Sequence, residues 1–252
     1  MLFLAMLLLG LIIGFVGAGG AGVTIALLTA GFGVPIHTAL AVALAAMVFT
    51  MISGTISHYR EGEVVAKTGA VIGTGGILGA LIGAEFAGCL PGSMLHDMTG
   101  WMLMMSAFTL YMKVYHSAFL DHHFHLRKEM LDGKKLYIYG ILCGMANGFL
   151  SGAFGIGAAA FIQLSLMVIF GVPLLKSIGT CMMIVLPISA SGGLDYLFNG
   201  YLDYWIFAQT VAGLMLGAFF GAKITHLAPL PFLKFMIVAL PTCGALTMLV
   251  LK

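Results

Sequence analysis

The chain contains an internal duplication. Its first part matches a later part at a constant offset of 138 residues, so that, for example, Gly10 corresponds to Gly148. The pattern Gly10-x-x-x-Gly14-x-x-Gly17-x-Gly19 returns as Gly148-x-x-x-Gly152-x-x-Gly155-x-Gly157. Phe32-Gly33-Val34-Pro35 returns in the same register as Phe170-Gly171-Val172-Pro173. Glycines therefore interrupt an apolar stretch at the same place in each unit. Paired, glycine-interrupted apolar segments are typical of transporters whose binding site lies between two repeats.

The composition places this duplication in a membrane. Of the 252 residues, 61% are hydrophobic and only 8% are charged, whereas about a quarter of the residues are charged in a typical soluble domain. The net charge of +2 is too small and too scattered to bind nucleic acid. We therefore predict an integral membrane protein that has the lipid bilayer as its partner and does not bind nucleic acid.

The glycine-broken segments, Leu2–Phe32 and Leu136–Phe170, decide the predicted topology. As helices, the pieces Met1–Gly14 and Gly22–Phe32 are about 21 and 16 Å long, too short for a hydrocarbon core about 30 Å thick. Each broken segment is interpreted as two half-length helices, in a re-entrant hairpin or as a pair of short tilted helices, and both arrangements return the chain to its starting side. The spanning helices predicted to follow are Thr38–Ser57, Lys67–Gly88 and Leu95–Tyr115, then Ser177–Leu197, Trp205–Thr225 and Phe232–Leu251.

Basic residues indicate the orientation, because they accumulate in cytoplasmic loops. Arg60 and Lys67 flank a loop of the first unit whose counterpart at residues 199–204 has no basic residue, and Lys176 and Lys223 fall on the neighbouring loops instead. The bias changes sides between the units, as two inverted-topology repeats require. The prediction is an all-α polytopic membrane protein with repeat 1 at residues 1–117, a cytoplasmic linker at 118–135, repeat 2 at 136–252, and both termini extracytoplasmic.

The glycine clusters are the candidate substrate site. Glycine lets the chain turn and lets a ligand approach the backbone. A helix N-terminus there presents unpaired N–H groups and a partial positive charge, which suit an anion. Polar side chains near the turns add donors, although such side chains also form purely structural bonds between helices. The predicted substrate-binding residues are Gly17, Gly19, Gly20, Thr24, Ser53, Asn147, Ser151, Gly155, Gly157, Gln163 and Ser191.

Two ionisable residues are candidates for coupling transport to a proton or ion. His58 and Asp195 lie near the ends of predicted spanning helices, where ionisable groups are functional by default. Snorkelling or helix capping at the membrane surface is the alternative interpretation of both. Gly79-x-x-x-Gly83 and Gly217-x-x-x-Gly221 are interpreted as helix-packing motifs.

Other chemistries are not predicted. The loop segment His122-His123-Phe124-His125 lacks the spaced cysteines or carboxylates of a metal site, so neither a metal nor a cofactor is expected. The four cysteines are dispersed and are interpreted as small packing residues. An intramembrane serine protease has a glycine two positions before its serine, in the motif Gly-x-Ser-Gly. Here the residue two positions before Ser151 is Phe149, so no enzymatic activity is predicted.

The two glycine segments also carry a family resemblance. Gly14-Phe15-Val16-Gly17-Ala18-Gly19-Gly20-Ala21-Gly22 and Gly148-Phe149-Leu150-Ser151-Gly152-Ala153-Phe154-Gly155-Ile156-Gly157 are each followed by a Gly-Val-Pro helix start. With this pattern the chain resembles the sulfite exporter TauE/SafE family over essentially its whole length. The second turn departs from the family's usual Gly-x-Gly-Gly-Gly, since it reads Gly155-Ile156-Gly157-Ala158-Ala159.

The resemblance implies a transporter of the bacterial inner membrane that exports sulfite, an organosulfonate or a related sulfur oxyanion. The residues themselves indicate an anion-accepting carrier that works by alternating access. The alternatives are a passive anion channel built from re-entrant half-helices, a cation- or proton-coupled carrier of another substrate, and a membrane scaffold without a transport function. The sequence leaves open which anion is moved, in which direction, with which coupling ion, and whether the protein is a homo-oligomer.

Overall fold

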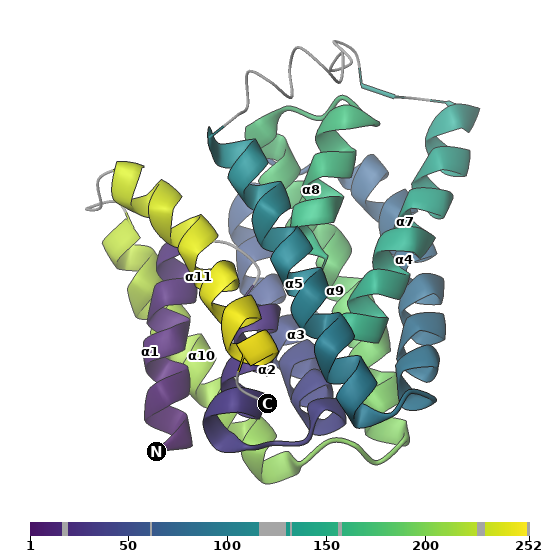
Figure 1. The fold of residues 1–252 in the computed structure, drawn as a ribbon. Helices are drawn as coiled ribbons and strands as arrows, with labels where there is room; N and C mark the ends of the chain where they lie inside the picture. Colours follow the sequence, from purple (N-terminus) through teal and green to yellow (C-terminus); the bar gives the residue numbers. More distant parts are fainter. Residues whose placement is uncertain are drawn as a thin grey trace.

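The computed structural model describes residues 1–16, 20–60, 62–115, 130–131, 133–155, 158–225 and 230–250, and in this part of the chain the regular elements are helices (Figure 1). The first unit contains α1 (Leu2–Val16), α2 (Ala21–Ala26), the π-helix η1 (Leu27–Gly31), α3 (Ile36–Arg60), α4 (Ala66–Gly88) and α5 (Gly92–Tyr115). The second unit contains α7 (Lys134–Phe154), α8 (Ala159–Val168), α9 (Leu174–Phe198), α10 (Tyr204–Thr225) and α11 (Leu230–Val250).

The duplication extends to individual backbone hydrogen bonds. Val34 N donates to Leu28 O at 3.0 Å, and the equivalent Val172 N donates to Leu166 O at 2.9 Å. The two units also share their left-handed turns, which only glycine adopts without strain. The equivalent pairs and their φ angles are Gly33 and Gly171 (65° and 64°), and Gly62 and Gly200 (74° and 76°).

The predicted spanning helices agree with α3, α4, α5, α9, α10 and α11 to within three residues at each described end. The first broken segment agrees as well, since the 15 residues of α1 rise about 22 Å. The second broken segment differs, because α7 has 21 residues and a rise of about 31 Å, long enough to span a bilayer. Its glycines do not interrupt it, because they pack closely against a neighbouring helix.

That neighbour is α4, and the contact confirms the packing interpretation of its glycines. A Cβ built on Gly79 would lie 2.8 Å from Phe149 N, and one built on Gly83 would lie 2.8 Å from Ala153 N. The equivalent contact joins α10 to α1, where a Cβ on Gly217 would lie 2.6 Å from Leu11 N. Backbone meets backbone at these positions, so only glycine fits there.

The main helix contacts join one unit to the other. α1 packs along α10 and α4 packs along α7, which are equivalent pairs under the duplication. α3 packs against its own counterpart α9, and α5 against its counterpart α11. In Figure 1 α1 and α5 run upward, whereas α7 and α11 run downward, and both termini lie toward the lower end. The core of the bundle is therefore shared by the two units.

The outside of the bundle is apolar, as expected of a surface that faces lipid. Three helices of the described part are long and apolar enough to cross a membrane, namely Ala66–Gly88, Lys134–Phe154 and Lys176–Phe198. Aromatic side chains are exposed near both ends of the bundle, where such rings mark the membrane interfaces. At the end where α3 stops and α7 begins these are Tyr59, Tyr137 and Tyr139, and at the opposite end Phe198, Tyr204 and Trp205.

Candidate functional site

The second glycine turn packs directly against the first unit. Gly155 ends α7 in a left-handed conformation with φ of 65°, and Ala158 precedes α8 with φ of 44°. A Cβ built on Gly155 would lie 2.6 Å from Ile25 Cδ1 of α2 and would also contact the side chain of Leu40 of α3. The turn therefore meets α2, the helix that contains the predicted site residue Thr24, within the shared core.

Several predicted site residues cannot be placed at this meeting point. Gly17, Gly19 and Gly157 lie outside the described residues, and of Ser53 only the backbone, within α3, is described. Gly20 is buried next to α1, where a Cβ would lie 2.6 Å from Ile13 Cγ1. The prediction for Gly17, Gly19, Ser53 and Gly157 remains a prediction.

Two of the predicted donors are hydrogen-bonded to their own helices. The buried Thr24 hydroxyl donates to Gly20 O at 2.9 Å, and the buried Ser191 hydroxyl donates to Ile188 O at 3.0 Å. Gln163 lies half-buried on α8. Each intrahelical acceptor is a neutral carbonyl, and an anionic oxygen accepts a stronger hydrogen bond than a neutral one. The Thr24 and Ser191 hydroxyls are therefore occupied within their own helices in the structure.

Asn147 and Ser151 lie one turn apart on α7 and differ in how they are satisfied. The buried Asn147 amide donates to Cys143 O at 2.9 Å and to Cys143 Sγ at 3.2 Å. The Ser151 side chain is 0% exposed, and its hydroxyl has no hydrogen-bond partner. Cys143, expected to be a packing residue, therefore also takes part in polar contacts.

No pattern in the sequence indicates a role for Tyr196. Tyr196 is 1% exposed, and its hydroxyl donates to Gly152 O at 3.1 Å, which joins α9 to the last turn of α7. Its ring meets Tyr201 edge-on, with the ring centroids 6.1 Å apart. The signal was hard to read because its counterpart in the first unit is His58, a residue of different chemistry.

We expect Tyr196→Phe to lower the stability of the purified protein while leaving its fold unchanged. The substitution keeps the buried ring and removes one hydrogen bond, a loss of about 1 kcal/mol. Thermal unfolding in detergent measures the change. Tyr204→Phe is the matched control, because the Tyr204 side chain is 71% exposed. Equal melting temperatures for the two variants would show that the Tyr196 hydroxyl does not hold α7 to α9.

The two candidate coupling residues lie at opposite ends of the bundle. His58, near the end of α3, places Nδ1 3.0 Å from Glu63 Oε2, and both side chains are about a quarter exposed, at 24% and 27%. Asp195, near the end of α9, accepts a hydrogen bond from Asn199 Nδ2 at 3.1 Å. Each residue has a local partner close to a helix end, an arrangement that also fits the alternative of capping or interfacial pairing.

Charge is separated between the two ends of the bundle. The described basic residues lie on helix ends at the end where α5 stops and α7 begins, which is the upper end in Figure 1. Four of the described acidic residues lie toward the opposite end. The basic residues are Arg60, Lys67, Lys113, Lys134, Lys135, Lys176, Lys223 and Lys234, and the four acidic residues are Glu85, Asp97, Asp195 and Asp203.

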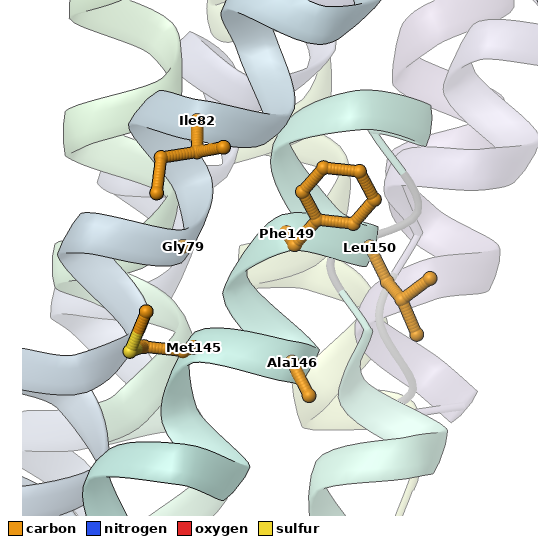
Figure 2. A pocket seen from close by; sticks show the side chains of 6 residues that line it. All are labelled: Gly79, Ile82, Met145, Ala146, Phe149 and Leu150. Atoms are coloured by element: carbon orange, nitrogen blue, oxygen red, sulfur yellow. The ribbon is translucent and has the colours of Figure 1, made fainter.

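A groove of about 490 Å³ lies elsewhere, between α4 and α7 (Figure 2). Its walls are apolar, and none of them is a predicted site residue. The lining residues are Gly79, Ile82, Met145, Ala146, Phe149 and Leu150. The part of the chain that the structure describes contains no group of three or more His, Cys, Asp or Glu residues able to hold a metal ion, and the run His122-His123-Phe124-His125 lies outside that part.

Comparison with known proteins identifies the family. The family model described as Sulfite exporter TauE/SafE matches residues 2–248. This chain belongs to the TauE/SafE family. It is 40% identical over 249 residues to the Probable membrane transporter protein YdhB of Bacillus subtilis (strain 168), and the match covers 99% of both chains.

A second relative is more distant. The chain is 24% identical over 231 residues to the Probable membrane transporter protein YjnA of Bacillus subtilis (strain 168), which covers 88% of this chain and 87% of that one. No solved structure matches the chain. The family and the names of both relatives place this TauE/SafE protein among membrane transporters.

Proposed function

We propose that this TauE/SafE protein carries a small sulfur oxyanion, such as sulfite or an organosulfonate, out of the cytoplasm across the bacterial inner membrane. The observation that carries this proposal is the match of the sulfite exporter family model to nearly the whole chain, residues 2–248. The described part of the structure supports a negatively charged substrate, since the candidate site combines a glycine turn with uncharged hydrogen-bond donors. Such a site binds a small anion and also releases it, whereas a bidentate arginine would hold the anion tightly.

The proposed mechanism is alternating access by two inverted repeats. Three observations support it: the equivalent helices α1 and α7 run in opposite directions, α3 and α9 pack as a self-equivalent pair, and the α1–α10 contact mirrors the α4–α7 contact. With a pseudo-twofold relation of this kind, the inward-open state becomes outward-open when each repeat takes up the conformation that the other had before. The described residues that we propose as substrate contacts are Gly20, Thr24, Asn147, Ser151, Gly155, Gln163 and Ser191.

The proposed orientation places both termini outside the cytoplasm. The described basic residues at the end where α5 stops and α7 begins support it, since basic residues are retained on the cytoplasmic side. His58 then lies on the cytoplasmic side and Asp195 on the opposite side. Both residues remain proposed coupling groups.

The transport proposal predicts saturable, protein-dependent efflux of sulfite from proteoliposomes. Labelled sulfite efflux is measured first, and counterflow is then tested with sulfate, thiosulfate, a short organosulfonate and chloride. Counterflow by the sulfur oxyanions and not by chloride is the expected result. Flux that does not saturate and shows no counterflow would favour the channel alternative, and flux that depends on a cation and not on an anion would favour a cation carrier.

A further inference from the structure

We propose that the oxyanion is bound asymmetrically, by side chains of the second repeat. These side chains form a polar ladder that consists of Cys143, Asn147 and Ser151 of α7 with Ser165 of α8. This inference rests on the proposed function and adds Cys143 and Ser165 to the residues that contact the substrate. It also predicts that the equivalent surface of the first repeat does not contribute side-chain donors.

The three α7 residues stand one helical turn apart, at four-residue spacing, so they share one face of the helix. The Asn147 amide is bonded to Cys143 O and Sγ, and the Cys143 thiol interacts with the Ser165 side chain. The polar ladder therefore crosses from α7 to α8. Cys143 and Ser165 are half-buried, Asn147 is 6% exposed and Ser151 is fully enclosed.

The first repeat lacks this ladder entirely. The positions equivalent to Cys143, Asn147, Ser151 and Ser165 are Ala5, Leu9, Ile13 and Leu27. Four polar residues thus replace four apolar ones, although the Gly-Val-Pro turns and the close contacts of α1 with α10 and of α4 with α7 repeat. Symmetric packing alone does not require polar side chains at these positions, because apolar ones serve at the equivalent positions.

The spacing of the ladder fits an oxyanion. Asn147 and Ser151 are not bonded to each other, and the helix rises about 6 Å between them, nearly the span of two hydrogen bonds of about 2.8 Å placed end to end. One anionic oxygen is thus able to accept from both. The rungs supply hydroxyl, amide and thiol donors and no positive charge, so the ligand class is a small hydrogen-bond acceptor such as a sulfur oxyanion.

The unpartnered hydroxyl of Ser151 is the independent observation that points to a ligand. Buried polar atoms normally have a partner, so an exception calls for an explanation. Of the buried side-chain atoms without a partner in the described part, Ser151 Oγ alone belongs to a residue with a polar side chain four positions earlier in the sequence. The others are His37 Nδ1, Thr55 Oγ1, Thr99 Oγ1, Ser189 Oγ and Thr210 Oγ1.

The direction of the ladder gives the route of the substrate. α7 begins at the basic end of the bundle, so Cys143 lies nearer that end than Ser151 does. In the proposed orientation an oxyanion from the cytoplasm meets the half-buried pair Cys143 and Ser165 first. It then passes Asn147 and reaches Ser151, one turn before Gly155, at the contact between the two repeats.

The Ser151→Ala variant distinguishes a role of the hydroxyl in ligand binding from a role in stability. In the ligand-free protein this substitution removes a hydroxyl that has no partner, so the melting temperature is expected to stay unchanged or to rise. The KM for sulfite efflux is expected to rise roughly tenfold to a hundredfold, because a hydrogen bond to a charged group is lost. Asn147→Leu and Ser165→Ala are expected to raise the KM as well. Thr74→Val is the matched control, since the Thr74 hydroxyl lies on an exposed position of α4 and is bonded to Val71 O at 2.8 Å.

Ligand-induced thermal stabilisation distinguishes the two ways of failing. Wild type and variants are heated with sulfite, thiosulfate, methanesulfonate, phosphate, glycerol and choline chloride, because a bound solute stabilises the folded state. Stabilisation by a solute other than a sulfur oxyanion, lost in Ser151→Ala, would remove the proposed substrate and keep the ladder. Sulfite transport with an unchanged KM in Ser151→Ala would overturn the ladder and keep the transport function. Absence of any Ser151-dependent stabilisation or KM change would also overturn the ladder.

Discussion

Gly148→Leu is expected to prevent the protein from accumulating in a folded form. A Cβ at residue 148 would lie 2.8 Å from Gly76 Cα and 2.9 Å from Gly76 C, and both are backbone atoms that cannot rotate away. α4 and α7 would have to separate along a contact that contains a glycine at each crossing point. Overpacking of a close-packed core typically costs about 1–3 kcal/mol, and a clash between two helix backbones lies at or above the top of that range.

The measurement is the yield of monodisperse protein after extraction in a mild detergent. Gly88→Leu is the control, because Gly88 ends α4 on an exposed position and a Cβ there meets nothing within 4 Å. We expect the control to behave like the wild type. A normal yield and melting temperature for Gly148→Leu would mean that the α4–α7 contact is much looser than the structure has it.

Gly155→Ala is expected to destabilise the protein more than Gly33→Ala, although both glycines have φ of 65°. Placing a side chain in the left-handed region costs about 1–2 kcal/mol at either position. A Cβ on Gly33 meets nothing within 4 Å, whereas one on Gly155 would lie 2.6 Å from Ile25 Cδ1 and also contact Leu40. The contact of the new Cβ with Ile25 and Leu40 adds a destabilisation of about 1–3 kcal/mol at Gly155.

Comparing the melting temperatures of Gly155→Ala and Gly33→Ala therefore isolates the packing term at the junction of the repeats. Equal shifts would mean that the turn does not press against α2 and α3. Because Gly155→Ala changes stability whether or not a ligand binds, loss of transport in a Gly155 variant is not evidence for a binding site. Ser151, which has no partner, is the sharper position for that question.

Much of the fold was predictable from the sequence because the duplication supplies a second copy of each boundary signal. Gly-Val-Pro occurs before both α3 and α9, and a proline fixes the start of each helix. The length of α7 was not predictable from its glycines alone. A glycine in an apolar segment either breaks a helix or lets another helix approach, and the partner decides which, as α4 does for Gly144 and Gly148.

Two members of the proposed polar ladder were predictable from the sequence. Asn147 and Ser151 are predicted substrate-binding residues because they are polar and lie beside a glycine turn. Both are buried on α7. Cys143 and Ser165, the other two members of the proposed ladder, were not predictable because a half-buried cysteine or serine has no distinctive pattern until its partner on another helix is known. The spacing of Cys143, Asn147 and Ser151 was the available signal, and the apolar residues at the equivalent positions of the first repeat make it stand out.

The pairing of α1 with α10 and of α4 with α7 has a consequence for biosynthesis. α1 is synthesised long before its main partner, Tyr204–Thr225. The glycine face of α4 likewise has no partner until Lys134–Phe154 has been inserted. The nascent first half must therefore reside in the bilayer with its packing faces against lipid, and the time until α10 arrives is the period in which membrane proteases and chaperones have access to it.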